Sequence, residues 1–184
     1  MLLEKAEIEK ISSEYDEKYP ESVHKEKELG KKIRKEKEIG KETLYEIVRW
    51  KFSSLPGRIK RTFNLLEETS DEIIRRTTRK ALSDNLLEDE KRIKELRKIK
   101  GIGISLASVI LTFCDPERYC IYDIHVVREL YGKEPKYMFT NNKYYFKLLQ
   151  DLRDLGQKTG LNVRTIEKAL FLKNIGKNSD DYSS

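Results

Sequence analysis

The sequence predicts an all-α fold. Apolar residues recur at spacings of three and four along most of the 184-residue chain, and no alternating segment of useful strand length occurs. Only four prolines and nine glycines interrupt the chain, which argues against disorder and against a β architecture rich in turns. We therefore expect nine or ten helices joined by short loops.

The composition limits the class of protein. Charged and hydrophobic residues each make up 38% of the chain, which suits one domain or two small helical lobes. No run approaches about 18 apolar residues, and the first ten residues are charged where a signal peptide is apolar. We expect a cytoplasmic protein without a membrane partner. Abundant lysine, glutamate and isoleucine give the composition a thermophile-like character.

Residues 1–41 are expected to form a charged helical N-terminal extension. Residues 1–40 carry a net charge of −1, whereas the rest of the chain carries +7. A near-repeat, KEKELGK from Lys25 and KEKEIGK from Lys35, has a ten-residue offset that matches no solenoid period. We predict a solvated arm of mixed charge, and the alternative is an arm that contacts a partner.

The sequence becomes globular in composition at Glu42. An apolar stripe beginning at Leu44 predicts a helix, and the turn residues 53–57 end it. Ser70 and Asp71 provide an N-cap for a later helix. The helices expected in this half cover 44–52, 58–66, 71–83 and 87–99, and the second of them is basic.

Four more helices are expected in the second half. An apolar helix begins at Ser105 and stops at Asp115-Pro116, and Asp123 is expected to cap a helix that Gly132 ends. The expected ranges are 105–114, 123–130, 143–155 and 163–174. The segment 118–122 is at most an extended linker.

Two cysteines limit the possible metal chemistry. Cys114 and Cys120 are too few for a four-thiolate iron–sulfur cluster. A zinc site would also need His24 and His125, and His24 lies far from the other three residues without the usual paired spacing. We expect two reduced, partly buried thiols, with a disulfide as the alternative.

The most informative segment is the turn Gly101-Ile102-Gly103 between two helices. The glycines permit a tight turn and the close approach of a foreign backbone, and Ile102 can anchor the turn in the core. The amides after the turn lie at a helix N-terminus, which suits a phosphate. A joint without a ligand is the alternative, and the apolar pattern on both sides favours a phosphate-binding hairpin.

Residues 96–111 resemble the helix-hairpin-helix motif. The segment 118–126, RYCIYDIHV, is similar to the loop and aspartate that follow this hairpin in the helix-hairpin-helix–GPD superfamily of DNA glycosylases. The resemblance covers about residues 88–131 well and about 42–175 loosely, through helix count and order. It does not cover the N-terminal extension.

The resemblance implies an architecture of two helical lobes around a cleft. The glycosylase-like domain would cover 42–184. Its hairpin lobe would cover about 58–131, and a discontinuous second lobe would combine about 42–57 with 132–175.

The resemblance also implies a catalytic role for Asp123. In this superfamily the matching carboxylate stabilises the oxocarbenium-like charge that grows on the sugar as the base leaves, or activates a nucleophile. From the residues alone Asp123 is equally a helix N-cap, and the two roles are compatible. Bifunctional members have a lysine where this chain has Ser105, so the chain is similar to monofunctional members, which use water and leave an abasic site.

DNA, in double-stranded form, is the expected partner, and no protein partner is predicted. The candidate nucleic-acid-binding residues are Lys98, Lys100, Gly101, Ile102, Gly103 and Ser105, with Arg58, Lys60 and Arg61 as further cations. The resemblance implies that the backbone carbonyls of Arg97, Ile99 and Ile102 can hold K⁺ or Na⁺ beside a DNA phosphate. No other cofactor is expected.

A base-handling enzyme holds its target in a pocket with an aromatic face. Our candidates are Tyr45, Trp50 and Tyr122, and Trp50 is the best of them because it lies off the apolar stripe of its helix. Ordinary packing is the alternative for Trp50. His125 is expected in a core or capping role, and Tyr137 fits either core or surface.

Three functions are compatible with the sequence. The first is a base-excision repair glycosylase that hydrolyses the N-glycosidic bond of a damaged or mispaired base without β-lyase activity, associated with the nucleoid in a prokaryote. The second is a non-catalytic glycosylase-like DNA-binding protein. The third is a helical structural or partner-binding protein. The hairpin disfavours the third, and Asp123 favours the first.

Overall fold

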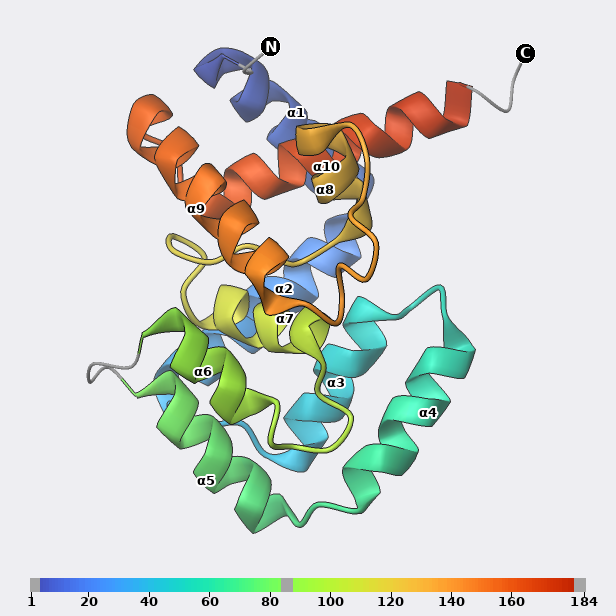
Figure 1. The fold of residues 1–184 in the computed structure, drawn as a ribbon, viewed down its shortest axis with the longest axis vertical. Helices are drawn as coiled ribbons and strands as arrows, with labels where there is room; N and C mark the ends of the chain where they lie inside the picture. The colour runs from blue at the N-terminus through green and yellow to red at the C-terminus, as the bar shows by residue number, and fades with distance from the viewer. Residues whose placement is uncertain (1–3, 84–87, 181–184) are drawn as a thin grey trace. The chain divides into compact units, whose positions relative to one another are not determined.

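The computed structural model describes residues 4–83 and 88–180, and these form ten α-helices without a β-strand (Figure 1). The all-α prediction is therefore confirmed for the described residues. The helices are α1 (Lys5–Lys18), α2 (Pro20–Glu36), α3 (Lys41–Lys51), α4 (Pro56–Glu67), α5 (Asp71–Leu82), α6 (Asp89–Leu96), α7 (Ile104–Cys114), α8 (Ile124–Tyr131), α9 (Asn142–Thr159) and α10 (Val163–Asp180).

Most helix ends fall where the sequence places them. The Ser70 hydroxyl accepts the backbone N–H of Ile73 at 3.3 Å and caps α5. Gly132 ends α8 with φ 78°. Helices α9 and α10 are longer than predicted. The predicted start of α6 at Leu87 lies outside the described residues.

The chain divides into two compact units. One contains the residues up to Val23 and those from Pro116 onward, and the other runs from His24 to Asp115. This division differs from the expected lobes. The segment 42–57 lies in the same unit as the hairpin because α3 packs on α7, and it is α1 that joins the C-terminal helices, through α10.

The expectation of a solvated N-terminal arm is wrong. Ile8 of α1 is completely buried, and Tyr15 is 6% exposed, with its ring 5.8 Å from that of Phe171. An ion pair of 2.8 Å between Asp16 and Lys168 adds a polar contact between α1 and α10. The first helix is therefore a core element of its unit.

The second half of the expected arm is also buried. Leu29, Ile33 and Ile39 are at most 1% exposed. The Arg34 guanidinium donates to the carbonyl of Phe113 at 2.7 Å, which fixes α2 against the C-terminal end of α7. The charged residues of the near-repeat therefore surround apolar positions that belong to the core.

Helix α7 is the centre of the unit that contains residues 24–115. It is apolar on all sides, as expected of a helix surrounded by others, and α3 and α6 both pack on it. Its two buried hydroxyl side chains are satisfied, because Ser108 donates to the Ser105 carbonyl and Thr112 to the Ser108 carbonyl, both at 2.8 Å. The hairpin therefore begins one of the most buried helices of this unit.

The other unit is organised around α10. Helices α1, α8 and α9 pack on it. Near its start Arg164 and Glu167 form an ion pair with side chains 5% and 2% exposed, and Glu167 also accepts the backbone N–H of Ile121 at 3.3 Å. This buried pair ties the extended segment before α8 to the helix.

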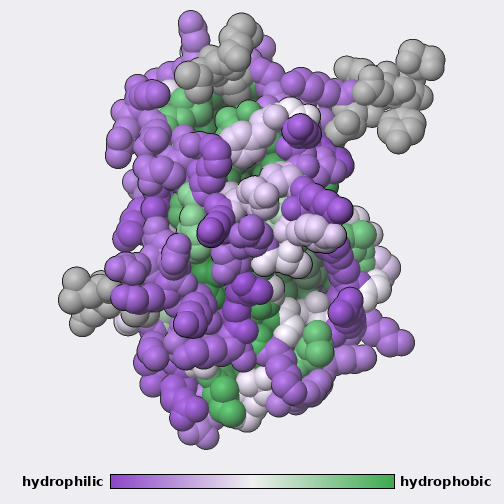
Figure 2. Space-filling view, in the orientation of Figure 1, coloured by the Kyte–Doolittle hydropathy of each residue, from purple (hydrophilic) through white to green (hydrophobic). Residues whose placement is uncertain are grey.

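The surface is mostly polar. Hydrophilic residues cover most of the face shown in Figure 2, with apolar residues visible between them. Among the described residues, no helix is both long enough and apolar enough to cross a bilayer.

We predict that Arg164→Ala lowers the free energy of unfolding by about 3 kcal/mol, because it leaves the Glu167 carboxylate buried without its cation. The double variant Arg164→Met/Glu167→Gln removes both charges and keeps an acceptor for the Ile121 amide. It should lose less than half as much stability in urea denaturation. A double variant as unstable as the single one would contradict this account of the pair.

Candidate nucleic-acid interface

The turn between α6 and α7 has the conformation expected of a glycine hairpin. Gly101 has φ +87°, which L side chains rarely adopt. A Cβ atom there would lie 3.2 Å from both the Thr62 carbonyl oxygen and the Leu65 Cβ atom. Ile102 is 4% exposed and its N–H donates to the Ile99 carbonyl at 3.1 Å, so it anchors the turn as predicted.

Gly103 plays a different part. Its backbone is extended, with φ −87° and ψ 178°, and a Cβ atom there would meet nothing within 4 Å. It is the N-cap of α7 without a side-chain cap, and its carbonyl accepts the Ala107 N–H at 3.0 Å. Helix α7 therefore begins at an exposed glycine without a side-chain cap, an arrangement that suits anion binding at a helix N-terminus.

The Gly101 contact brings the basic helix α4 to the hairpin. Arg58 and Arg61 each precede one of the two contacting residues, Thr62 and Leu65, by four positions, so they lie one turn away on that face. Both arginines and Lys60 are exposed, and the first turn of α4 has no acidic residue. We call residues 97–105 with these three cations the hairpin surface.

Two of the three lysines of the hairpin surface, Lys98 and Lys100, have acidic partners. Lys98 donates to Glu95 at 2.7 Å, and Lys100 pairs with Glu68 of the segment after α4. Both lysine side chains are more than half exposed, and an exposed pair such as Lys100–Glu68 contributes at most about 1 kcal/mol. A phosphate can therefore displace Glu68 from Lys100 at small cost, whereas the Glu95 side chain is only 13% exposed.

The remaining predicted hairpin ligands have mixed surroundings. Ser105 is half-buried, and its carbonyl accepts the Ser108 hydroxyl. The carbonyls expected to hold a monovalent cation are those of Arg97, Ile99 and Ile102. One of them, the Ile99 carbonyl, accepts a hydrogen bond within the turn. The cation site stays a prediction.

Asp123 lies in the other unit, at the N-terminus of α8. Its Oδ1 accepts the His125 N–H at 3.0 Å, so the capping role is confirmed. His125 has the structural role expected of it, since its Nδ1 lies 2.9 Å from Asn174 Oδ1 and its ring lies edge-on to Phe171. The catalytic role of Asp123 stays a prediction.

The three aromatic candidates have different surroundings, each within its own unit. Tyr122 is completely buried in the unit of Asp123, and its hydroxyl donates to the Met138 carbonyl at 3.2 Å, so it is a core residue. Trp50 is half-buried, with its ring edge-on to Phe113 at 4.9 Å, which is the packing alternative.

Tyr45 packs against the basic helix α4, because its ring lies 4.4 Å from that of Phe63. Its hydroxyl donates to Glu67. Burial and this carboxylate raise the pKa of Tyr45 to about 12, so the phenol stays protonated at neutral pH.

The cysteines are free thiols, as expected. Burial raises the pKa of both the Cys114 and the Cys120 thiol, and Cys120 is completely buried. Neither thiol therefore offers a reactive thiolate.

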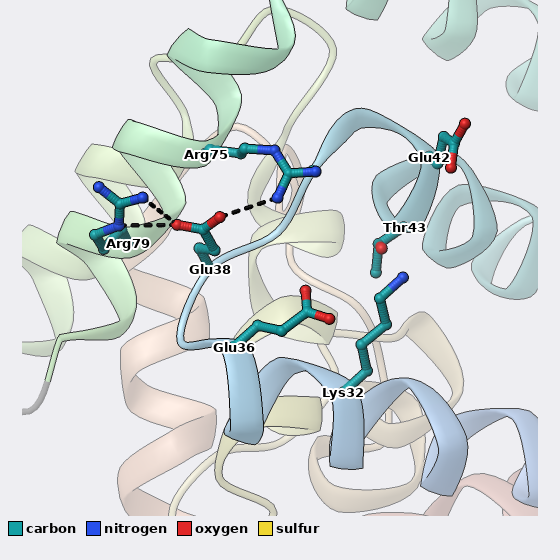
Figure 3. Close-up of a pocket in the computed structure, with 8 residues that line it drawn as sticks. Lys32, Glu36, Glu38, Glu42, Thr43, Arg75 and Arg79 are labelled. Carbon is teal, nitrogen blue, oxygen red and sulfur yellow. Dashed lines mark hydrogen bonds and ion pairs between the residues drawn. The ribbon is translucent and has the colours of Figure 1, made fainter.

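A charged pocket of about 610 Å³, which the sequence did not lead us to expect, lies in the unit that contains the hairpin. Figure 3 shows Glu38 between Arg75 and Arg79, with an ion pair of 2.9 Å to Arg75. Two features of the sequence could have indicated this pocket. Arg75 and Arg79 are four residues apart, and Gly40 stands where a Cβ atom would clash with the Arg75 guanidinium. The residues that line it are Lys32, Glu36, Glu38, Gly40, Glu42, Thr43, Arg75 and Arg79. Three of these are cationic and three are carboxylates, so its charge favours neither anions nor cations.

The pocket generates a pH prediction. Hydrogen bonds from Arg75 and Arg79 hold the pKa of Glu38 below its ordinary value of 4.5. A carboxylate whose pKa is lower in the folded state stabilises the fold above its unfolded pKa and loses that contribution as the pH falls through the folded value. The melting-temperature difference between wild type and Glu38→Gln should therefore shrink between pH 6 and pH 3.

The matched control is Glu42→Gln, which removes a carboxylate from the same pocket. Both variants are measured over the same range, and the shrinking difference is expected of Glu38→Gln, because it is Glu38 that accepts hydrogen bonds from the two arginines. A Glu38→Gln difference that stays constant with pH would contradict the ion-pair account.

The chain matches no protein-family model, and neither the search of curated proteins nor that of solved structures finds a similar protein.

Proposed function

We propose that this protein binds the DNA backbone through the hairpin surface and hydrolyses the N-glycosidic bond of a damaged or mispaired base. The observation that carries the proposal is the pair of glycines. Gly101 fixes the turn with a positive φ, and Gly103 leaves the N-terminus of α7 open and without a side-chain cap. This geometry supports a phosphate contact made by backbone amides.

Such contacts hold DNA without reading its sequence. Amide and arginine contacts to phosphates set register and orientation, and base edges carry the sequence information. The exposed cations Arg58, Lys60 and Arg61 add to the same backbone-directed attraction. Specificity for a lesion would therefore come from the ease of extruding a damaged base.

The proposed chemistry uses Asp123 and water. As the bond between C1′ and the base breaks, its electron pair leaves with the base, and an ionised carboxylate stabilises the cationic sugar. Water adds to C1′, one of its protons is lost, and the departing base gains a proton, which leaves an abasic site. Asp123 lies at the N-terminus of α8, where the helix dipole stabilises a negative charge. Ser105 supplies no amine for a covalent intermediate at the position where lyases carry lysine.

A second candidate is a DNA-binding protein without chemistry. It is favoured by the observation that the Asp123 carboxylate already caps α8 through the His125 amide. Under this candidate Asp123 is structural, and the hairpin surface alone binds the DNA.

We predict that Gly103→Val lowers the affinity for a plain DNA duplex about tenfold, because its side chain would cover the amides at the start of α7. The fold should tolerate the change, since the site is open and the backbone extended. The log–log slope of affinity against salt should stay close to that of wild type, because the variant keeps the cations that release counterions from the DNA. Fluorescence anisotropy titrations at several salt concentrations measure both the affinity and the slope.

The matched control is Gly57→Val, which places the same side chain in open space in the first turn of α4. It should bind DNA much as wild type does. Wild-type affinity in Gly103→Val would show that the hairpin is not the phosphate site.

We predict that Asp123→Asn loses base release by about a hundredfold or more in a single-turnover assay on damaged duplexes. Asparagine is as good an N-cap as aspartate, so the fold and the DNA affinity should be retained. Borohydride should trap no covalent adduct with wild type. If Asp123→Asn releases base at the wild-type rate, Asp123 is not catalytic. If wild type releases no base from any lesion, the non-catalytic candidate replaces the enzyme.

A further inference from the structure

The segment between α8 and α9 displays an aromatic ring on a constrained backbone. Tyr137 is 68% exposed, the highest value among the large hydrophobic residues that the structure describes. Its φ is +62°, a conformation that is unfavourable for a bulky L residue. In the described residues only Lys37 shares this feature outside glycine. Backbone outliers that persist are held by their surroundings and concentrate at functional sites.

Hydrogen bonds hold this conformation in place. The Tyr137 carbonyl accepts the backbone N–H groups of Thr140 at 3.0 Å and Asn141 at 3.2 Å, and also the Thr140 hydroxyl at 2.9 Å. The next residue, Met138, is 4% exposed, and its carbonyl accepts the Tyr122 hydroxyl. The turn is thus anchored in the core directly beside the exposed ring, which presents the ring without much loss of conformational entropy on binding.

Three lysines flank Tyr137 in the sequence, and one of them lies over its ring. Lys133, Lys136 and Lys143 are all exposed, and within the described residues none of their ammonium groups has an acidic partner at ion-pair distance. The Lys136 Nζ lies 5.1 Å from the centroid of the Tyr137 ring. The acidic residue of this segment, Glu134, accepts two hydrogen bonds of 2.7 Å from Arg128, which neutralise it. We call residues 133–143 the aromatic–basic loop.

A second ring belongs to the same loop. Phe139 is 37% exposed, and its ring packs edge-on against Tyr122 at 5.5 Å. Exposed aromatic rings among cations are the combination that binds unpaired nucleotides, because a base stacks on the ring while lysines contact the phosphates. An acidic protein partner would use the lysines but would not need a flat exposed ring.

We propose that the aromatic–basic loop is a second nucleic-acid site, at which an unpaired base stacks on Tyr137 and the flanking phosphates contact Lys133, Lys136 and Lys143. The inference rests on the proposed DNA binding and deepens it, because it adds unpaired DNA to the substrates the protein recognises. It lies in a different unit from the hairpin surface and uses different contacts.

The positive φ at Tyr137 provides a variant that should fold well. Tyr137→Gly removes the ring and places a residue that accepts this conformation readily. Tyr137→Phe keeps the ring and removes the hydroxyl. Lys37→Gly is the matched control, because it makes the same backbone change at the other non-glycine residue with positive φ in the described chain, where no aromatic ring is lost.

The probe is a 12-nucleotide DNA single strand with one 2-aminopurine, whose fluorescence falls when it stacks on an aromatic ring. Wild type should bind it and quench the signal. Tyr137→Gly should bind about tenfold more weakly and lose the quenching, whereas Tyr137→Phe and Lys37→Gly should behave as wild type. The inference is overturned if wild type does not bind the single strand, or if Tyr137→Gly keeps the wild-type affinity and quenching. Either result would leave a protein contact as the better account of this loop.

A parallel titration with plain duplex separates this inference from the proposed function. If Gly103→Val weakens duplex binding while Tyr137→Gly changes neither titration, the proposed function stands and the inference fails. If Tyr137→Gly weakens single-strand binding while Gly103→Val leaves duplex binding unchanged, the loop site stands and the hairpin proposal fails.

Discussion

The contact between Gly101 and helix α4 is the constraint on which the candidate DNA surface depends. The φ angle of Gly101 is +87°, and a Cβ atom at this position would lie only 3.2 Å from the Thr62 carbonyl oxygen. Glycine is therefore strongly favoured over every other residue at position 101. The contact fixes the direction of the turn and brings the basic side of α4 next to the start of α7. Gly103, two residues later, is exposed in open space and leaves room for a ligand. Gly101 is thus required by packing, and Gly103 adds no side chain at the start of α7.

Local signals in the sequence predicted the helices and their ends well. Ser70, Asp123 and Gly132 act at helix ends through hydrogen bonds or a positive φ that depend on neighbouring residues only. The turn at Gly101 and Gly103 was predictable for the same reason. The burial of the N-terminal helices was not, because their apolar residues, such as Ile8 and Ile33, are few and lie among many charges. That burial depends on partners far along the chain, including Phe171 and Phe113, and periodicity carries no information on such partners.

The same difference between local and long-range signals applies to the candidate site residues. The roles of Gly101 and Ile102 in the turn could be predicted from local spacing. The surroundings of Tyr122, Trp50 and Lys100 could not, because they depend on tertiary contacts. Tyr122 is a core residue whose hydroxyl is satisfied by Met138, and Lys100 is paired with Glu68. The sequence did not decide whether Tyr137 lies in the core or on the surface, because its exposure and its positive φ are properties of the folded turn.

The central claim is that the amides at the start of α7 contact a DNA phosphate, and amide-resolved NMR tests it most directly. Titration of the ¹⁵N-labelled protein with a short plain duplex should shift the amide signals of Ile104, Ser105 and Leu106 at low DNA concentration, together with those of α4. Added salt should reverse the shifts. Shifts confined to other parts of the chain, with these three amides unchanged at saturation, would contradict the account.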